Sequence, residues 1–189
     1  MNIIPTALDG VFVILPRIFG DSRGYFFESW NQTDFDGALA AQGHAPVRFV
    51  QDNESLSSFG VIRGLHFQAP PFAQAKLVRV VRGTVLDVVV DIRRGSPNYG
   101  RHASVELSGE NHRQLFIPRG FAHGFSVLSP EAVFQYKCDA FYAPDADFGI
   151  SPSDPALGID WRIPEGSAVL SPKDFGWPSF ADFVSPFNL

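Results

Sequence analysis

The sequence predicts an all-β protein, built as a double-sheet antiparallel jelly roll with short peripheral helices and a C-terminal tail wrapped around it. Three observations support this fold class. The 189 residues include 17 glycines and 15 prolines, which interrupt the chain at short intervals. Between them lie short runs with the composition of strands, joined by turn sequences such as 82–84 and 118–120. Many short antiparallel strands at this spacing build a sandwich or a barrel.

Each strand is predicted from an apolar run or from alternating apolar and polar residues. In the first half of the chain these runs cover residues 11–15, 25–30, 47–53, 61–67 and 75–82. In the second half they cover residues 85–92, 102–107, 114–117, 122–128 and 132–140. Turns at 94–97 and 108–111 separate neighbouring strands, and little of the chain remains for helices.

One helix is predicted at residues 33–42, with Asn31 or Thr33 as its N-cap and Gly43 at its end. From Asp145 onward the chain is rich in Pro, Gly and Asp, which predicts short turns or helices. We find no internal linker and no long repeat. Residues 1–189 are therefore expected to form a single domain.

The composition limits the classes of function. Hydrophobic residues make up 45% of the chain and charged residues 19%, which is ordinary for a globular protein. The net charge of −5 includes no basic tract, which argues against binding to nucleic acid or to an anionic membrane surface. Neither end resembles a signal peptide or a membrane span, and Cys138 is the only cysteine. We therefore expect a soluble, cytoplasmic protein without an intramolecular disulfide.

The run 60–68 carries the most chemical information. It places His66 among apolar residues, with Arg63 three positions before it and Lys76 ten positions after it. Cationic side chains are rarely buried without partners, so this cluster indicates an anionic ligand or a developing negative charge. In a regular strand, Arg63 and His66 would face opposite sides. Gly64 permits a bulge that would aim both side chains inward.

Tyr136 and Asp174 extend this hypothesis. A barrel would bring Tyr136 to the pocket of His66, where an imidazole base and a phenol acid on opposite walls suit proton exchange next to a carbonyl. Asp174 is a candidate to hold the imidazole in one tautomer. The alternatives at this point are a hydrogen-bonded core histidine at position 66, a packing tyrosine at position 136, and a simple turn around Asp174.

A metal site is not predicted. The run Pro118-x-Gly120-x-x-His123 resembles the second motif of the cupin type of jelly roll, and His66 falls where the first motif would be. However, Gln68 stands at the position of a second histidine ligand, no Glu lies between Gln68 and Gly83, and Lys76 would repel a divalent cation. No Gly-rich dinucleotide fingerprint is present either, so no redox cofactor is expected.

Linked motifs along nearly the whole chain resemble the dTDP-4-dehydrorhamnose 3,5-epimerase family. These motifs are Gly20-Asp21-x-Arg23-Gly24-Tyr25-Phe26-x-Glu28, Phe49-Val50-Gln51-Asp52-Asn53, Arg63-Gly64-Leu65-His66-Phe67-Gln68, Ile117-Pro118-x-Gly120-Phe121-Ala122-His123-Gly124-Phe125 and Leu157-Gly158-Ile159-x-Trp161. The resemblance implies a cofactor-free enzyme of the cupin jelly-roll type that acts on a dTDP-linked 4-keto-6-deoxy sugar.

The resemblance also implies roles for individual residues. It makes His66 the general base, Asp174 the residue that orients it, and Tyr136 the proton donor. Tyr142 would stack on the thymine. The remaining matches to substrate-contacting positions are Arg23, Glu28, Gln51, Asn53, Arg63, Lys76, His123 and Lys173. Two positions depart from the family pattern: Glu54 follows the Gln-Asp-Asn motif, and the shorter Asp147 replaces a Glu that contacts the nucleotide.

Members of the family are strand-exchanged homodimers, which implies that Arg23 and Glu28 serve the partner's site. Three alternatives stay open on the sequence. The first is an epimerase of the same family that inverts only C3 or only C5. The second is a metal-dependent cupin enzyme, and the third is a non-catalytic protein that binds sugar nucleotides.

Overall fold

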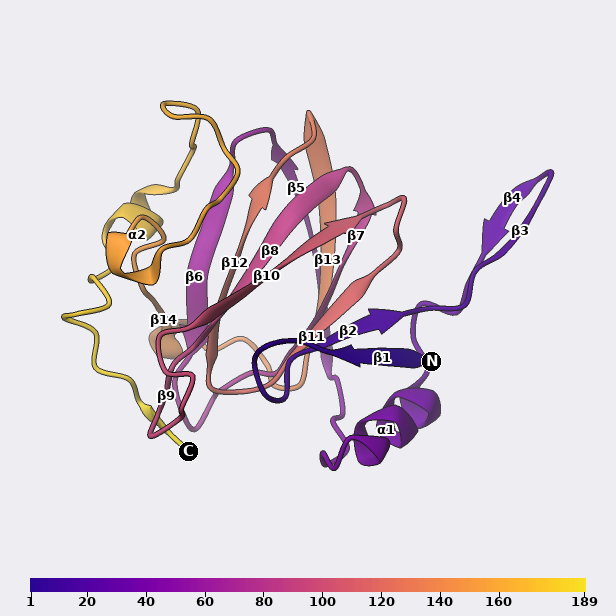
Figure 1. The fold of residues 1–189 in the computed structure, drawn as a ribbon, viewed down its shortest axis with the longest axis horizontal. Coiled ribbons are helices and arrows are strands. Elements are labelled where there is room, and N and C mark those ends of the chain that lie inside the picture. Colours follow the sequence, from indigo (N-terminus) through magenta and orange to yellow (C-terminus); the bar gives the residue numbers. More distant parts are fainter.

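Two antiparallel sheets pack face to face and form the body of the protein (Figure 1). A computed structural model describes residues 1–189. The first sheet has the order β1 (Asn2–Pro5), β2 (Phe12–Leu15), β11 (Gln114–Ile117), β7 (Lys76–Arg82), β13 (Glu131–Cys138) and β5 (Gln51–Ser58). The second has the order β10 (His102–Ser108), β8 (Thr84–Asp91), β12 (Phe121–Val127), β6 (Ile62–Gln68) and β14 (Asp147–Gly149). The predicted all-β jelly roll is confirmed.

Alternation along the strands sorts side chains between the inside of the sandwich and its outer faces. On β7, Val78 and Val80 enter the central core, where they meet residues such as Val89 and Phe125 of the second sheet. Leu77 instead faces outward, where it packs under the helix α1 (Gln32–Ala41) with Phe35. Side chains at odd and even positions of β7 therefore have different partners. Inner positions at the end of the strand that begins with Lys76 are left to line a pocket.

The outer face of the second sheet is covered by the C-terminal tail. Leu65 and Phe67 of β6 pack there against tail residues such as Ile150 and Trp161. The tail contains the short helices η1 (Pro144–Ala146), η2 (Pro155–Leu157) and α2 (Pro172–Phe175), which lie beside β6 and β14 (Figure 1). A last strand, β15 (Phe187–Asn188), pairs in parallel with β9 (Arg93–Arg94). This tail follows the prediction of short turns and helices that wrap the body.

The predicted helix is confirmed almost to the residue. Its N-cap is Asn31, whose side chain accepts a hydrogen bond from the Asp34 backbone N–H at 3.2 Å. No helix in the chain is long and apolar enough to cross a membrane.

Two strand predictions were wrong in their bounds. The aromatic run 25–30 is not one strand: only Gly24–Phe26 (β4) is extended, and it pairs with β3 (Phe19–Asp21). The run 47–53 contains only the beginning of β5, which continues to Ser58. The rest of β5 gave no apolar pattern because its residues are mostly polar and every second one is exposed to solvent. The short strands β1, β3, β9, β14 and β15 were not predicted.

The β3–β4 hairpin projects away from the body, and its end lies far from the sheets (Figure 1). Phe19, Tyr25 and Phe26 on this hairpin are all at least half exposed. Large apolar side chains that are exposed in this way indicate a surface that binds a partner.

Candidate active site

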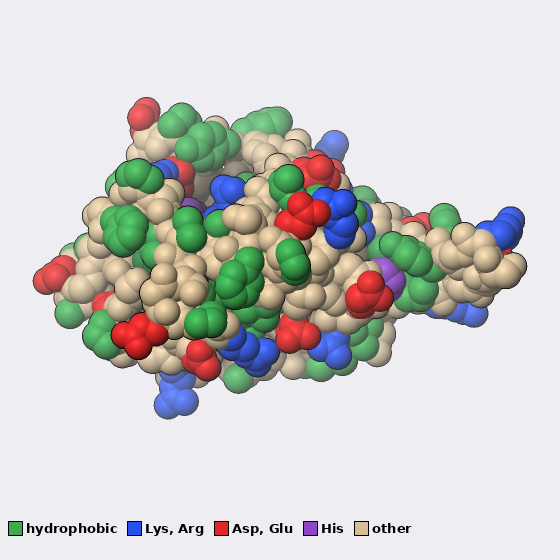
Figure 2. Space-filling view, turned by 90° about the horizontal axis from the view of Figure 1, so that it is seen from above, with side chains coloured by type: hydrophobic (Ala, Val, Ile, Leu, Met, Phe, Trp, Pro, Cys, Tyr) green, Lys and Arg blue, Asp and Glu red, His purple; other side chains and the backbone are tan.

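A pocket opens at one end of the sandwich, between the two sheets. It consists of two hollows of about 170 and 310 Å³, and both are lined by His66, Lys76 and Tyr136. The smaller hollow also contacts Arg63 and His123. Figure 2 shows a hollow in the surface with histidine and basic side chains at its floor. The larger hollow adds the side chains nearer the surface, which are Gln51, Asn53, Gln68, Tyr142 and Asp147.

The strands bring these side chains together because each occupies an inner position. His66 on β6 lies opposite His123 on β12 in the second sheet. Lys76 on β7 and Tyr136 on β13 belong to the first sheet. The imidazole of His66 and the phenol of Tyr136 therefore stand on opposite walls of one pocket.

The predicted bulge in β6 is confirmed. The pairing of β6 with β12 shifts register between His123, which pairs with His66, and Phe125, which pairs with Arg63. Gly64 lies within this shift with φ of +133°, a conformation that favours glycine. Because of the extra residue, Arg63 and His66 line the same hollow. The Arg63 guanidinium also donates a hydrogen bond from Nε to the Ser57 hydroxyl at 3.0 Å.

His66 forms a hydrogen bond with Asp174, 108 residues further along the chain. The distance from His66 Nε2 to Asp174 Oδ1 is 2.5 Å, and Asp174 is only 3% exposed. Burial would raise the pKa of the Asp174 carboxyl, but hydrogen bonds from His66, Ser171 and Trp177 outweigh burial and hold this pKa below its ordinary value. An ionised carboxylate only accepts hydrogen bonds, so Nε2 carries a hydrogen, and Nδ1 is the ring nitrogen left to act as a base.

A second histidine–aspartate pair, not predicted from the sequence, joins His123 of the pocket wall to a carboxylate buried behind it. His123 Nε2 lies 3.0 and 2.9 Å from the two carboxylate oxygens of Asp87, which is fully buried. Burial is the main cause that raises the pKa of Asp87, while His123 and Lys76 act in the opposite direction. A carboxylate within the apolar run 85–92 was the available signal for this partner.

Burial also tunes the two groups on the first sheet. It lowers the pKa of the Lys76 ammonium, with nearby Cys138, Asp147 and Asp87 opposing this effect. Burial raises the pKa of the Tyr136 phenol, which therefore keeps its proton at neutral pH. A protonated phenol facing an imidazole with a free lone pair can transfer protons to and from opposite faces of a bound molecule.

Polar contacts organise the outer part of the pocket. The Tyr142 hydroxyl donates to Asp147 Oδ2 at 3.0 Å, and Lys173 Nζ donates to the same oxygen at 2.7 Å. Gln51 accepts a hydrogen bond from the Tyr142 backbone N–H at 2.9 Å and donates to Asn53 Oδ1 at 3.0 Å. The structure thus places an exposed aromatic ring, an ammonium and amide side chains around one rim.

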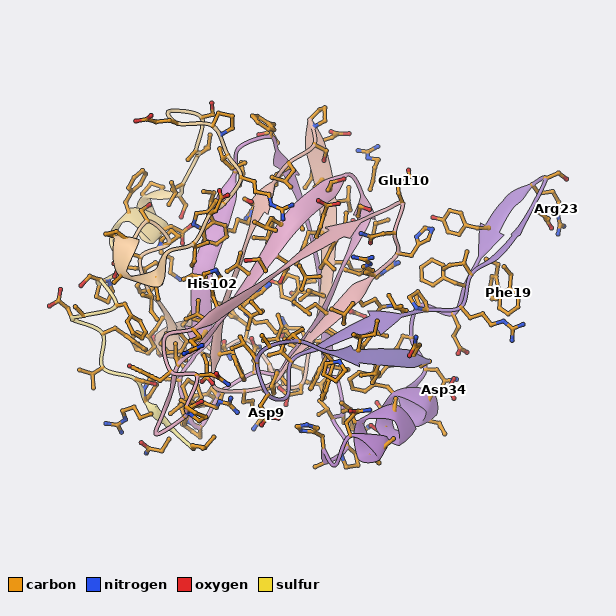
Figure 3. All side chains as sticks on the ribbon, viewed as in Figure 1. Asp9, Phe19, Arg23, Asp34, His102 and Glu110 are labelled. Carbon is orange, nitrogen blue, oxygen red and sulfur yellow. The ribbon has the colours of Figure 1, made fainter.

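Arg23 and Glu28 do not reach the pocket of their own chain. Arg23 lies near the tip of the projecting hairpin (Figure 3), where its 88% exposed side chain pairs with Asp21 at 2.6 Å. Glu28 accepts a hydrogen bond from the Asn31 side chain at 3.1 Å, beside the start of α1. These two predicted site residues are therefore separated from the others within a single chain.

The chain contains no group of three or more His, Cys, Asp or Glu side chains arranged to hold a metal ion. Cys138 lines the larger hollow, and burial raises the pKa of its thiol to about 11. At neutral pH this thiol is protonated and unsuited to nucleophilic attack or to ligation.

Comparisons with known proteins identify one family along nearly the whole chain. The family described as dTDP-4-dehydrorhamnose 3,5-epimerase matches residues 5–182. The chain is 50% identical over 182 residues to the dTDP-4-dehydrorhamnose 3,5-epimerase of Shigella flexneri, covering 96% of this chain and 97% of that protein. The dTDP-6-deoxy-D-glucose-3,5-epimerase of Legionella pneumophila, solved in complex with dTDP-4-keto-L-rhamnose, is 46% identical with a TM-score of 0.93, covering 100% of this chain and 98% of that one.

A more distant structure shares the fold as well. A 3'-monoepimerase from Streptomyces bikiniensis, solved in complex with dTDP-quinovose, is 35% identical with a TM-score of 0.85, covering 94% of this chain and 87% of that one. The match of the family over 5–182 includes both walls of the pocket and the helix that carries Asp174. The chain belongs to the dTDP-4-dehydrorhamnose 3,5-epimerase family.

Proposed function

We propose that this protein epimerises dTDP-4-dehydro-6-deoxy-D-glucose at C3 and C5 to give dTDP-4-dehydro-L-rhamnose, without a cofactor. One observation carries the proposal: the His66–Asp174 pair and the Tyr136 phenol line opposite walls of one pocket that also contains Lys76. The similarity to epimerases that act on this class of sugar nucleotide supports the same reaction.

The reaction follows from the positions of His66 and Tyr136 on opposite walls of the pocket. The free lone pair of His66 takes the hydrogen next to the C4 ketone as a proton, and the electron pair of that C–H bond moves to the C4 oxygen. Tyr136 then donates its proton to the same carbon from the opposite face, which inverts the centre. General acid–base catalysis of this kind contributes about 10²- to 10⁴-fold to the rate.

Between the two steps the C4 oxygen carries a negative charge. Lys76 and Arg63 supply positive charge in the same hollow. One well-placed donor to such an oxygen contributes about 3 kcal/mol to the stability of the transition state. Stabilisation of this charge accounts for the presence of Lys76 and Arg63 in apolar strands, which core packing does not explain.

The outer part of the pocket is proposed to bind the nucleotide. Tyr142 offers an exposed ring for the thymine, and Lys173 offers a positive charge to the diphosphate. Asp147 holds both of these side chains through hydrogen bonds. Gln51, Asn53 and His123 would complete the contacts to the substrate.

We further propose a cytoplasmic homodimer that exchanges its hairpins. Arg23 and Glu28 lie outside their own pocket, while Phe19, Tyr25 and Phe26 are exposed on an arm that projects from the body (Figure 1). Binding of this arm to a second copy of the chain would bury these aromatic side chains. It would also carry Arg23 toward the partner's site.

The test of the reaction is incubation with dTDP-4-keto-6-deoxyglucose in deuterated water, with proton NMR of the product. We expect deuterium at both C3 and C5 and inversion at both centres. The His66→Ala variant should fold but show no deuterium uptake. Wild-type uptake by this variant would contradict the assignment of the base.

The Tyr136→Phe variant provides a matched comparison. It keeps the base, so deuterium exchange should continue, while inversion should fall because the opposite face lacks its proton donor. Equal loss of exchange and inversion in both variants would contradict the assignment of two separate groups.

The second candidate function is inversion of a single centre, which the likeness to the 3'-monoepimerase favours. The same NMR experiment separates the two functions, since deuterium would then appear at only one carbon and only that centre would be inverted.

Metal analysis of the purified protein tests the metal-dependent alternative: stoichiometric iron, manganese or zinc would contradict the cofactor-free reaction. Binding of the sugar nucleotide with no deuterium uptake at all would indicate a non-catalytic binding protein.

A further inference from the structure

We infer that Trp177 is a positioning residue, which holds the Asp174 carboxylate so that His66 keeps its lone pair directed at the substrate. This inference rests on the proposed function of His66 as the base. Trp177 follows the short helix α2 and was not among the residues that sequence patterns identify.

The indole N–H of Trp177 and the imidazole N–H of His66 bind one and the same oxygen. Trp177 Nε1 donates to Asp174 Oδ1 at 3.3 Å, while His66 Nε2 donates to it at 2.5 Å. The two rings also meet edge to face, with centroids 6.3 Å apart and an interplanar angle of 70°. The indole therefore contacts both members of the pair.

The remaining oxygen of the carboxylate is held from the other side. The Ser171 hydroxyl donates to Asp174 Oδ2 at 2.9 Å. With donors on both oxygens, the carboxylate cannot rotate without losing a hydrogen bond in a site that is 3% exposed. The fixed carboxylate in turn fixes the orientation of the His66 ring. The orientation of the ring then sets the direction in which Nδ1 points.

The sheet is shaped to receive this indole. Gly149 on β14 pairs with His66 in the register of the strands, and a Cβ at position 149 would lie 2.5 Å from Trp177 Nε1. Only a residue without a side chain lets the indole approach this closely. Lys173 Nζ lies 5.3 Å from the centroid of the Trp177 ring, which adds a cation–π contact on the same side chain.

The test compares Trp177→Phe with Trp161→Phe. Phenylalanine keeps an aromatic ring but removes the N–H donor at either position. Trp161 is the matched control, since its Nε1 donates to the Pro152 carbonyl at 2.8 Å. It packs in the cluster between the second sheet and the C-terminal tail, and it does not line the pocket. For Trp177→Phe we expect kcat to fall about tenfold with KM unchanged, the size expected for one hydrogen bond to a charged group. For Trp161→Phe, kcat should stay at the wild-type value.

Proton NMR gives a readout that does not depend on activity. The imidazole proton shared by His66 and Asp174 should give a downfield signal, which Trp177→Phe displaces or broadens and Trp161→Phe leaves in place. An unchanged signal and kcat in Trp177→Phe would overturn the inference, as would an equal fall in kcat in both variants. If wild-type protein shows no epimerisation, the proposed function fails, while the NMR signal still decides whether Trp177 holds the pair.

Discussion

At the scale of single residues, the two histidine–aspartate pairs of this protein are electrostatically different. Asp174 lies at the start of a helix with donors on both oxygens, and its pKa is lowered. Asp87 lies in the middle of the second sheet, where burial dominates and its pKa is raised. The carboxylate that binds His66 is therefore firmly ionised, whereas the carboxylate that binds His123 is costly to ionise.

This difference predicts opposite contributions to stability. A lowered carboxyl pKa stabilises the folded state above the unfolded value of 3.8 and loses this effect as pH falls through the folded pKa. A raised pKa does the reverse: stability falls as pH rises from 3.8 through the folded pKa. We therefore expect Asp174→Asn to lower the free energy of unfolding at pH 7 and to flatten its decline below pH 3.8.

Urea unfolding of the variants at a series of pH values measures this effect. Asp87→Asn is the control of opposite sign: it keeps an acceptor for His123 while it removes the charge that burial disfavours. Its penalty at pH 7 should be smaller than that of Asp174→Asn. Identical pH profiles for the two variants would contradict the assigned difference.

At the scale of elements, the irregular pairing of β6 with β12 decides which side chains enter the pocket. Gly64 makes this pairing possible because its backbone approaches β12 closely. A Cβ at position 64 would lie 2.6 Å from the Gly124 Cα and 2.8 Å from the His123 carbonyl oxygen. Both strands would have to separate to admit a side chain, and Arg63 and His66 would move with them.

Gly64→Ala should therefore reduce both stability and activity. The left-handed conformation alone costs about 1–3 kcal/mol for a residue with a side chain, and the clash with β12 adds to it. The measurement is urea unfolding, followed by kcat at a temperature where the variant is fully folded.

Gly37→Ala supplies the matched control. Gly37 lies on α1, and a Cβ there meets nothing within 4 Å. Alanine should stabilise the helix by about 0.5–1 kcal/mol and leave catalysis unchanged. A Gly64→Ala variant as stable and as active as wild type would show that the pocket does not depend on this bulge.

At the scale of the whole molecule, the projecting hairpin separates one predicted site into two parts. His66, Lys76 and Tyr136 lie in the body, whereas Arg23 lies at the far end of the arm (Figure 3). In an exchanged dimer, each site would combine the body of one copy with the arm of the other. Defects in the body and in the arm should then complement each other.

We expect a mixture of Arg23→Ala and His66→Ala chains, refolded together from urea, to regain activity that neither variant has alone. In the mixed dimer, one site receives an intact His66 from one chain and an intact Arg23 from the other. The measurement is epimerase activity of the refolded mixture, with the mass of the particle determined by light scattering.

The matching control is a mixture of His66→Ala and Asp174→Asn chains. Each chain then carries a defect in its own body, so every site of the mixed dimer lacks either His66 or the Asp174 carboxylate and activity should not return. A monomeric mass in solution, or recovery in the control mixture, would contradict the exchanged dimer.

The pocket was predictable where its residues lie in short motifs on strands. Residues 60–68 combine a histidine, an arginine and a permissive glycine, and strand alternation then limits where they can point. The polar edge strand β5 was placed only in part, because half of its residues meet solvent and give no apolar pattern. The partners of the histidines were harder to predict, because a hydrogen bond depends on direction at about 3 Å and not on separation along the chain.

By itself, the sequence determined an all-β jelly roll and the central place of His66, Arg63, Lys76 and Tyr136, because period-two alternation and turn residues are local properties of the chain. Only the tertiary structure decided that Asp87 pairs with His123, that Trp177 shares an oxygen of Asp174 with His66, and that Arg23 lies outside its own pocket. These contacts join segments far apart in the sequence, and they form only when the sheets, the tail and the hairpin are packed in three dimensions.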